Sequence, residues 1–368
     1  MHLGTHALLE FFRARRDEDA LVLATIIATA GSTYRKPGAM MLIARDGGYE
    51  GMISGGCLEG DLLHHAAAVF EAGSPARVTY DMHADEELVW NLGLGCDGVI
   101  HLLLQRLDRE SGFGFLTPLD VAQRARRAGL LALVTQGDAS LATGSFGLLD
   151  GAGATHGDPQ LVQSLADLAD DGWPRWRCRR LRLGAEDVVE DGAEAVAINL
   201  PARTRVLLCG AGPDAVPMAR AFAGLDWDVL IADHRPAFAK PDRFPPGCTV
   251  IRTRPERLAD ALAGDGLDAA VIMSHHLDND AAWLAQLAGG DIPYIGVPYI
   301  GVLGPRARRD RLLQMAGCQQ AVYGPVGLDI GAELPAAIAL AVAAEIHAVL
   351  NGRDGRPLTI RTDERQEA

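Results

Sequence analysis

The second half of the chain alternates short apolar runs with stretches of helical spacing. Arg205–Cys209 is a continuous apolar run of strand length, and after a glycine turn the apolar positions of residues 216–222 recur at helical intervals. Asp228–Ala232 is a second strand-length run. Further strands are expected at residues 248–251, 269–273, 299–303 and 320–323. Strands that alternate with helices in this way predict a Rossmann-like, doubly wound parallel sheet.

The first half of the chain has a mixed pattern. Amphipathic helices are expected over residues 58–70 and 119–128, and the glycine-rich residues 113–157 are expected to contain long loops. Strands are expected at residues 21–28, Met40–Ile43, 99–107 and 130–134, with a hairpin around Asp191-Gly192 whose arms are residues 188–189 and 195–198. The fold prediction is therefore an α/β chain. It has an N-terminal mixed α/β domain over residues 1–202, a C-terminal Rossmann-like domain over residues 203–355 and a flexible polar tail over residues 356–368.

Composition and charge narrow the classes of function. The chain has 34 basic and 48 acidic residues, a net charge of −14, and 32 Arg against 2 Lys. General affinity for nucleic acid or anionic lipid is not expected, because a polyanion would be repelled. Glu345 and His347 interrupt Pro335–Leu350, the most apolar stretch, so no membrane-spanning helix is expected. Without a recognisable secretory signal, and with six cysteines that form no C-x-x-C pair, the chain is expected to be cytoplasmic with reduced thiols.

A possible nucleotide site follows from the glycine turn of the second half. Gly210 and Gly212 lie between a strand and a helix, with Ala215 at the third glycine position, and Asp233 ends the second strand. In dinucleotide-binding folds the glycines admit a pyrophosphate to a helix N-terminus, and the acidic residue binds a ribose hydroxyl. The alternative is a Rossmann-like domain that binds no nucleotide. Arg235 suits either a 2′-phosphate or a structural role at the strand end.

Ser274 and His275 follow the strand expected at residues 269–273. They would lie at the carboxyl edge of the sheet, where doubly wound folds bind ligands. The neighbouring pairs His64-His65 and His275-His276 make no natural chelate, because adjacent helical residues point about 100° apart.

Two glycine-cysteine loops lie in the first half. The loop Ser54-Gly-Gly-Cys57 precedes an expected helix, so Cys57 falls at or near its N-terminus, where N–H groups and the helix dipole favour an anion. A thiolate attacks electrophiles, binds metals or carries a persulfide sulfur, so Cys57 is a candidate reactive residue. The alternative is a small buried residue at a tight turn. The second loop contains Gly95 and Cys96, whose flanking glycines would bring backbone close to a ligand.

A Gly/Pro turn at residues 31–38 places Arg35 beside Lys36. Turns of this kind present N–H groups and cations to a phosphate, and the alternative is a solvated hairpin tip. The pentapeptide Pro-Tyr-Ile-Gly-Val occurs twice in tandem, at residues 293–297 and 298–302, and is expected to lengthen an edge loop or a strand start. A cluster of four arginines is expected on the solvated face of a helix: Arg306, Arg308, Arg309 and Arg311.

Six of these segments together resemble the signature blocks of the XdhC/CoxI family, the accessory factors of xanthine dehydrogenase and related molybdenum hydroxylases. The segments are residues 33–39, 54–59, 93–96, 273–275, 299–306 and 325–333. They run in order over nearly the whole chain, and only residues 113–200 are poorly marked. The tandem pentapeptide departs from the family pattern, in which one copy is expected. The two glycine-cysteine loops look closer to the carbon monoxide dehydrogenase accessory branch, which leaves the target enzyme open.

The resemblance implies a cofactor chaperone rather than an enzyme. Such a protein binds the molybdenum cofactor, which is molybdopterin with or without an appended nucleotide. It keeps the cofactor while a cysteine desulfurase supplies the terminal sulfur, and it assists insertion into the apo form of a molybdenum hydroxylase. Cys57 matches the family's cysteine, a candidate contact to molybdenum or its sulfur, and a homodimer is expected. NAD(P) is a candidate second ligand. The candidate cofactor-binding residues are Arg35, Lys36, Ser54, Gly55, Gly56, Cys57, Glu59, Gly95, Cys96, Gly210, Gly212, Asp233, Ser274 and His275.

Two other hypotheses stay open. One is an NAD(P)-dependent oxidoreductase that uses His275 as general acid or base, although a simple dehydrogenase does not need the two glycine-cysteine loops. The other is a structural partner that docks desulfurase to hydroxylase and would keep its function without Cys57.

Overall fold

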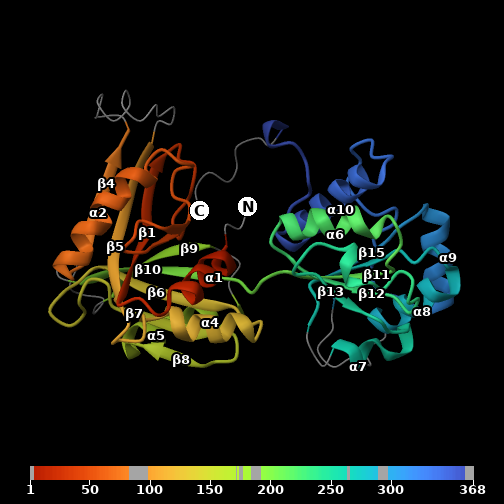
Figure 1. Cartoon of the computed structure of the whole chain (residues 1–368), viewed down its shortest axis with the longest axis horizontal. Helices are drawn as coiled ribbons and strands as arrows, with labels where there is room; N and C mark the ends of the chain where they lie inside the picture. The colour runs from red at the N-terminus through yellow and green to blue at the C-terminus, as the bar shows by residue number, and fades with distance from the viewer. Residues whose placement is uncertain are drawn as a thin grey trace. The chain divides into compact units, whose positions relative to one another are not determined.

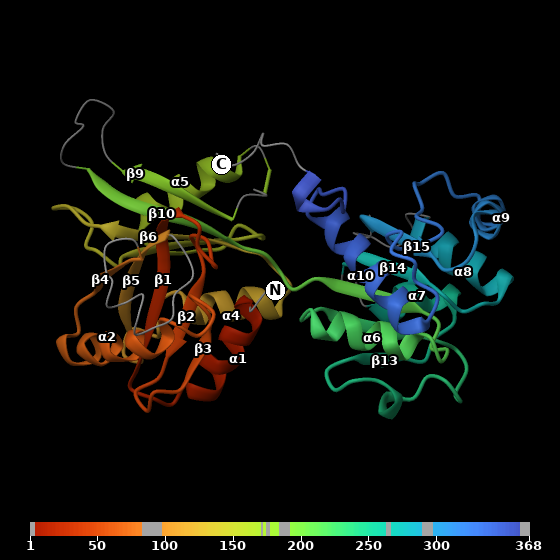
Figure 2. The same ribbon diagram turned by 90° about the horizontal axis from the view of Figure 1, so that it is seen from above.

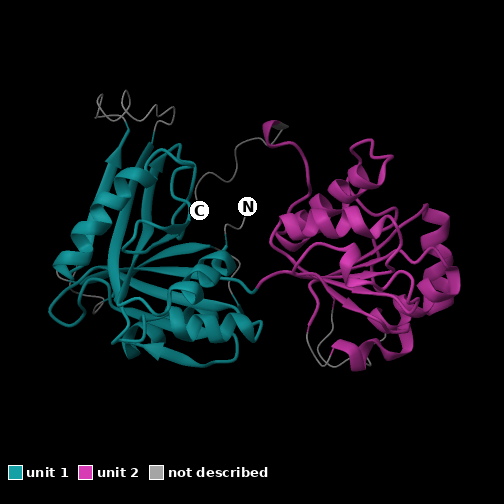
Figure 3. Cartoon of the chain, viewed as in Figure 1, with its two compact units in different colours: residues 1–202 teal, residues 203–368 magenta. Residues whose placement is uncertain are grey.

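The computed structural model describes residues 4–82, 98–170, 172–173, 177–183, 192–262, 266–288 and 297–360. The chain divides into two compact units, residues 1–202 (unit 1) and residues 203–368 (unit 2), coloured separately in Figure 3. Each unit has its own sheets and its own hydrophobic core.

Unit 1 contains two five-stranded antiparallel sheets, which Figure 1 shows from the side. The first sheet has the order β3-β2-β1-β5-β4, and the second has the order β8-β7-β6-β10-β9. The strands of the first sheet are β1 (Ala20–Gly31), β2 (Met40–Ile43), β3 (Tyr49–Gly51), β4 (Ala76–Asp81) and β5 (Gly98–Asp108). Those of the second are β6 (Gly129–Gln136), β7 (Phe146–Asp150), β8 (Thr155–Gly157), β9 (Cys178–Leu183) and β10 (Ala193–Leu200).

The alternation of side chains along β1 shows how unit 1 is layered. Leu21 and Leu23 pack between the two sheets, whereas Val22 and Ala24 face the opposite way, toward α2. The second sheet is covered on its outer face by α5 in the same manner. The helices of unit 1 are α1 (Thr5–Arg15), α2 (Glu59–Ala72), α4 (Leu116–Arg124) and α5 (Pro159–Ala169). Both faces of β1 are therefore buried, which accounts for its continuous apolar sequence.

Unit 2 is the doubly wound parallel sheet that the sequence predicts, with the order β13-β12-β11-β14-β15. Its strands are β11 (Arg205–Cys209), β12 (Asp228–Ala232), β13 (Thr249–Ile251), β14 (Ala269–Ile272) and β15 (Tyr299–Val302). Leu208 packs on the face covered by α6 and α10, which lie side by side in Figures 1 and 2, and Leu207 packs on the other face. The helices are α6 (Ala215–Gly224), α7 (Leu258–Leu262), α8 (Leu277–Ala288), α9 (Arg306–Ala316) and α10 (Pro335–Leu350). All pairings in the sheet are parallel.

Several local predictions were wrong. The strand expected at residues 320–323 is reduced to a single bridge between Gly301 and Tyr323, because its polar start leaves too short an apolar run. Residues 113–157 are mainly helix and strand, since glycines such as Gly144 and Gly153 lie in tight turns at positive φ rather than in long loops. The helix expected at residues 119–128 is Leu116–Arg124. The hairpin arm expected at residues 188–189 lies outside the described residues, and among the described residues β10 pairs with β9.

The second copy of the tandem pentapeptide forms β15, an edge strand, while residues 293–296 of the first copy lie outside the described residues. In the tail, Leu358–Ile360 is a short 3₁₀ helix, and residues 361–368 are likewise not described. Within the part of the chain that is described, no helix has both the length and the apolar character needed to cross a membrane.

Candidate functional site

Three segments marked by the sequence meet at one end of the first sheet of unit 1. β1 ends at Gly31, which pairs with Gly98 at the start of β5. A Cβ on Gly98 would lie 2.5 Å from the carbonyl oxygen of Ser32, so the start of β5 touches the turn that follows β1. A Cβ on Gly55 would lie 3.7 Å from the ring of Tyr34, so the cysteine loop lies against the same turn. We call residues 31–38 and 53–58 the unit 1 loop cluster.

The carboxylate of Glu59 holds the cysteine loop together from inside. Its Oε1 accepts hydrogen bonds from the amides of Ile53 at 2.9 Å and Ser54 at 2.8 Å. Its Oε2 accepts from the amide of Gly56 at 2.9 Å and the hydroxyl of Ser54 at 2.7 Å. The Ser54 hydroxyl in turn accepts from the amide of Leu58 at 2.8 Å. The anion that the loop amides bind in this structure is therefore the chain's own carboxylate, and Glu59 and Ser54 act by shaping the loop.

The pKa of Glu59 depends on both its burial and these hydrogen bonds. Burial alone would raise the pKa of this carboxyl, but the hydrogen bonds from Ser54 and Ile53 outweigh it and lower the pKa below its ordinary value. Glu59 is therefore ionised and fully engaged at neutral pH.

Cys57 lies just before α2, which begins at Glu59 with Leu58 as its N-cap. Its side chain is half-buried. The two preceding glycines have φ of +90° and +115°, values that favour glycine. A Cβ on Gly56 would meet nothing within 4 Å, so the loop is open at that position. Side-chain-free backbone next to a half-exposed thiol leaves room for a ligand to approach Cys57.

The two cations of the residue 31–38 turn differ in their surroundings. Lys36 is exposed, whereas Arg35 is half-buried, and burial together with the nearby Arg177 lowers its pKa. Cys178, at the start of β9, comes to the same place, since a Cβ on Gly38 would lie 3.4 Å from its Cβ. Burial raises the pKa of the Cys178 thiol to about 11, so this thiol stays protonated at neutral pH.

Arg177 and Cys178 were missed by the sequence reasoning. The available signal was a run of four arginines between residues 177 and 182 in an acidic chain. Gly95 and Cys96, the second glycine-cysteine loop, lie outside the described residues, although Gly98 directly after them borders the loop cluster.

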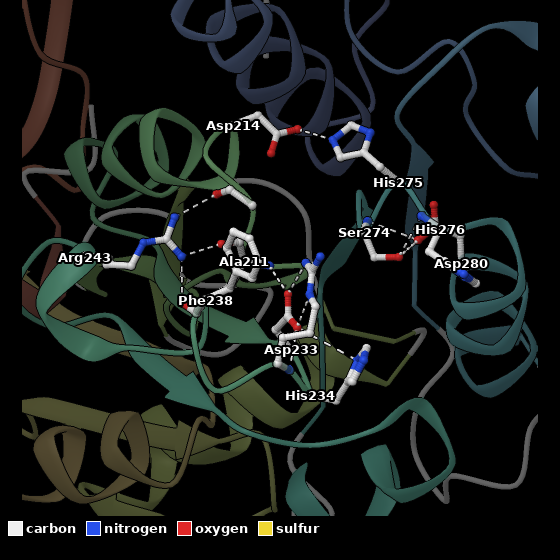
Figure 4. A network of polar contacts seen from close by, with 12 residues as sticks. Ala211, Asp214, Asp233, His234, Phe238, Arg243, Ser274, His275, His276 and Asp280 are labelled. Carbon is white, nitrogen blue, oxygen red and sulfur yellow. Dashed lines mark hydrogen bonds and ion pairs between the residues drawn. The ribbon is translucent and has the colours of Figure 1, made fainter.

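In unit 2, Asp233 is buried and bonded within the protein (Figure 4). Its carboxylate accepts from the amide of Ala211 at 2.8 Å and from the Arg235 guanidinium at 2.7 and 3.0 Å. Burial raises the pKa of Asp233, but the hydrogen bonds from Arg235 and Ala211 dominate and lower it. Asp233, the residue expected to bind a ribose hydroxyl, is thus bonded to Arg235, the candidate for a 2′-phosphate contact.

The glycine turn of unit 2 is closed by a second arginine. Arg243 donates to the carbonyl oxygens of Ala211 at 2.6 Å and Phe238 at 2.7 Å, as Figure 4 shows. A Cβ on Gly210 would lie 2.8 Å from the backbone of Met273, so this glycine permits the close approach of β11 and β14. Arg243 also donates to the carbonyl oxygen of Gly212 at 3.4 Å, so two turn carbonyls and the amide of Ala211 are engaged in internal contacts.

His275 is joined to the start of α6. Its Nε2 lies 2.6 Å from Oδ2 of Asp214, the N-cap residue of that helix, and the imidazole faces this carboxylate in Figure 4. The hydrogen bond to Asp214 raises the pKa of His275, and partial burial opposes the shift. The other carboxylate oxygen of Asp214 is buried, and we find no hydrogen-bond partner for it among the described residues.

Ser274 is held by a different carboxylate. Its hydroxyl lies 2.5 Å from Oδ1 of Asp280, which also accepts from the Ser274 amide at 3.1 Å. Arg308 donates to the other oxygen of Asp280 at 2.5 Å. The expectation that all four arginines of α9 are solvated was therefore wrong for Arg308, which compensates a buried carboxylate. Asp214, Arg243 and Asp280 were not expected at the site. Each has at least one partner far away in sequence: Asp214 contacts His275 across 61 residues, Arg243 contacts Ala211 across 32, and Asp280 contacts Arg308 across 28.

No group of three or more His, Cys, Asp or Glu side chains in the described ranges is arranged to hold a metal ion. Cys57 therefore belongs to no such group, and a metal ion at the loop cluster would need most of its ligands from outside these side chains.

Comparison with known proteins places both units. Residues 206–346 match the model of the XdhC Rossmann domain, and residues 14–81 match that of the XdhC and CoxI family. A Bacillus subtilis (strain 168) protein named as a probable xanthine dehydrogenase subunit is 31% identical over 351 residues, which cover 94% of this chain and 96% of that protein. A crystal structure of a xanthine dehydrogenase from Bacillus halodurans superposes with a TM-score of 0.76 at 28% identity, covering 95% of this chain and 96% of that one.

A shorter match links the chain to an Escherichia coli (strain K12) protein named molybdenum cofactor insertion chaperone PaoD. The two are 31% identical over 110 residues, which cover 30% of this chain and 33% of that protein. The fold and the loop cluster thus define a two-unit α/β protein with a Rossmann-type second unit. The chain belongs to the XdhC and CoxI family, and the expected resemblance is confirmed.

Proposed function

We propose that the chain is an accessory factor of a xanthine dehydrogenase-type molybdenum hydroxylase, which holds the molybdenum cofactor during sulfuration and assists its insertion. Family membership and the similarity to an insertion chaperone support the accessory role. The observation that carries the cofactor-binding part is the unit 1 loop cluster, in which Cys57, the open Gly56 backbone and the cations of the neighbouring turn come from separate segments to one end of a sheet.

The chemistry of this cluster fits the proposed cargo. Molybdopterin ends in a phosphate and holds its metal through a dithiolene, and a soft thiolate such as that of Cys57 suits the metal or its terminal sulfur. Because Glu59 takes the loop amides, the phosphate would be held by Arg35, Lys36 and Arg177 rather than by the start of α2. Burial and the nearby Arg177 both lower the pKa of Arg35, and a bound dianion would relieve the repulsion between the two guanidinium groups.

Cofactor content tests this proposal directly. The chain is co-expressed with the cofactor biosynthetic enzymes and purified without oxygen, and bound pterin and molybdenum are measured per chain. We expect both in the parent protein and a strong loss in Cys57→Ala. The matched control is Cys318→Ala, which removes another half-buried thiol in unit 2 and is expected to change neither. A parent protein that carries no pterin would overturn the cofactor-binding part.

Two further parts of the proposal need their own measurements. A cysteine desulfurase is the expected sulfur donor, and pull-down with the purified chain tests that contact. A homodimer is expected, and sedimentation tests it. The docking hypothesis makes a different prediction from ours, since Cys57→Ala would then still activate the hydroxylase in a reconstitution assay.

Unit 2 is proposed to bind a nucleotide, either NAD(P) or the nucleotide part of the cofactor. Its strand order and glycine turn support this, because doubly wound sheets bind ligands at their carboxyl edge. Within the described part of the chain, one buried oxygen of Asp214 beside the turn has no hydrogen-bond partner, and a ligand hydroxyl would satisfy it.

A further inference from the structure

A surface hollow of about 520 Å³ lies at the carboxyl ends of β12 and β13 in unit 2. That volume is in the range of small-molecule sites, roughly 300 to 1,000 Å³. The side chains that matter to its chemistry are His234, Arg252, Thr253, Arg254, Arg257 and Asp260. None of them was selected by the sequence reasoning, and none takes part in the loop cluster of unit 1.

The hollow is basic in a chain whose net charge is −14. Three guanidinium groups, one imidazole and one carboxylate line it. Arg257 is paired with that carboxylate, Asp260, at 3.4 Å, and the imidazole of His234 lies 3.9 Å from Asp233. For Arg252 and Arg254, both exposed, no ion pair is found within the residues that the structure describes. Neighbouring arginines that share no carboxylate repel one another, and an anion between them removes that repulsion.

The backbone between these arginines is fixed. The Thr253 hydroxyl donates to the carbonyl oxygen of Arg254 at 3.2 Å, and Pro255 follows at the start of a 3₁₀ turn. Arg254 itself has extended backbone, with φ of −92° and ψ of 159°. The arginines therefore extend from a constrained segment directly after β13, and the ordering of their backbone does not have to be supplied by a ligand.

Two neighbouring arginines at this edge already form hydrogen bonds within the protein. Arg235 is bonded to Asp233, and Arg243 is bonded to the carbonyl oxygens of the glycine turn. Because β12 and β13 lie on the same side of β11, a ligand that passes the glycine turn toward this side would next reach His234 and the hollow. The cations left for such a ligand are Arg252 and Arg254.

We infer that the hollow binds the phosphate monoester of a nucleotide-sized ligand, with Arg252 and Arg254 as its main contacts. A phosphate monoester carries close to two negative charges at neutral pH and offers several acceptor oxygens, which match two or three guanidinium groups. The inference rests on the proposed nucleotide binding by unit 2 and specifies which part of the ligand is recognised and where.

Matched ligand pairs test the inference by titration calorimetry on the full chain. NADP⁺ and NAD⁺ differ only in a 2′-phosphate, and CMP and cytidine differ only in a 5′-phosphate. We expect the phosphorylated member of one pair to bind at least about tenfold more tightly, and each of Arg252→Gln and Arg254→Gln to weaken it by about tenfold or more, as for loss of a charge-assisted hydrogen bond. The pair that shows this preference identifies the source of the phosphate.

The matched control is Arg220→Gln, which removes an exposed arginine of α6 and is expected to leave binding unchanged. Equal binding of the two members of both pairs would overturn the inference, as would binding that is insensitive to Arg252→Gln and Arg254→Gln. Pterin content of the purified protein is measured in the same variants. Failure of the phosphate site leaves that content unaltered, so it is distinguishable from failure of the proposed cofactor role.

Discussion

The imidazole of His275 and the carboxylate of Asp214 form a 2.6 Å contact across 61 residues of sequence. The hydrogen bond from this pairing raises the pKa of His275. Because a raised pKa favours the protonated folded state, the contact stabilises the fold fully below the unfolded value of about 6.5 and loses that contribution as pH rises through the folded value. We expect Asp214→Asn to lower the pKa of His275 and to remove this pH dependence.

An NMR titration of the His275 ring measures the effect. Asp278→Asn, which alters an exposed carboxylate at the start of α8, is the control and should leave the titration nearly unchanged. A His275 pKa that is the same in Asp214→Asn and in the parent would contradict the assignment.

Glu59→Gln is expected to destabilise unit 1 by about 1 to 3 kcal/mol, because an amide NH₂ would face an N–H donor that the carboxylate now satisfies. The lowered pKa of Glu59 gives the sign of the pH effect. Its contribution is present above the unfolded value of about 4.3 and is lost as pH falls through the lower folded value. The difference in the free energy of unfolding between parent and variant, measured by denaturant unfolding, should therefore be smaller at pH about 3 than at neutral pH. Glu110→Gln, at an exposed turn, should match the parent throughout.

Two glycine substitutions are expected to act in opposite directions. A Cβ on Gly98 would lie 2.5 Å from the backbone oxygen of Ser32, so Gly98→Ala should displace the turn after β1 and cost about 1 to 3 kcal/mol. Gly60 lies in the first turn of α2 with nothing within 4 Å of such a Cβ, so Gly60→Ala should stabilise the helix by about 0.5 to 1 kcal/mol. Melting temperatures of the two variants that move in the same direction would be inconsistent with the described packing.

Removing only the cation from the pair of half-buried Arg308 and buried Asp280 should lower the free energy of unfolding strongly. Arg308→Met leaves the carboxylate of Asp280 without its cation, and we expect a loss of about 3 to 5 kcal/mol in the free energy of unfolding. The double variant Arg308→Met with Asp280→Asn should lose less than the sum of the single losses. Arg311→Met on the exposed side of α9 serves as the control. Additive losses in the double variant would show that the pair is not coupled.

The strands of unit 2 were predicted from the sequence more completely than those of unit 1. After one charged residue at their start, β11 and β12 are short, apolar and followed by turn residues, so both their type and their parallel pairing were predictable. In unit 1 both faces of β1 are buried, so its periodicity does not reveal that two sheets pack together. β9 was missed because its exposed positions are arginines, and a polar edge strand lacks the apolar alternation on which strand prediction depends.

For the site, local geometry was predictable and partners were not. The positive φ of Gly55 and Gly56 and the position of Cys57 before a helix follow from local sequence. The capture of the loop amides by Glu59 depends on a side-chain conformation set by packing. The internal bonding of Asp233 is partly of this kind: Arg235 lies only two residues away, but Ala211 is brought to the carboxylate by the pairing of β11 with β12.

The ring of Phe238 limits which residues can replace the two arginines that lie over it. The guanidinium carbons of Arg235 and Arg243 lie 4.3 and 5.4 Å from its centroid, while the same two groups bind Asp233 and the turn carbonyls. A planar group can stack and donate several hydrogen bonds at once, whereas an ammonium cannot. An exchange of Arg for Lys is neutral at most surface positions. At these two positions it would weaken the contacts that hold the glycine turn, so we expect Arg and not Lys to be required at both.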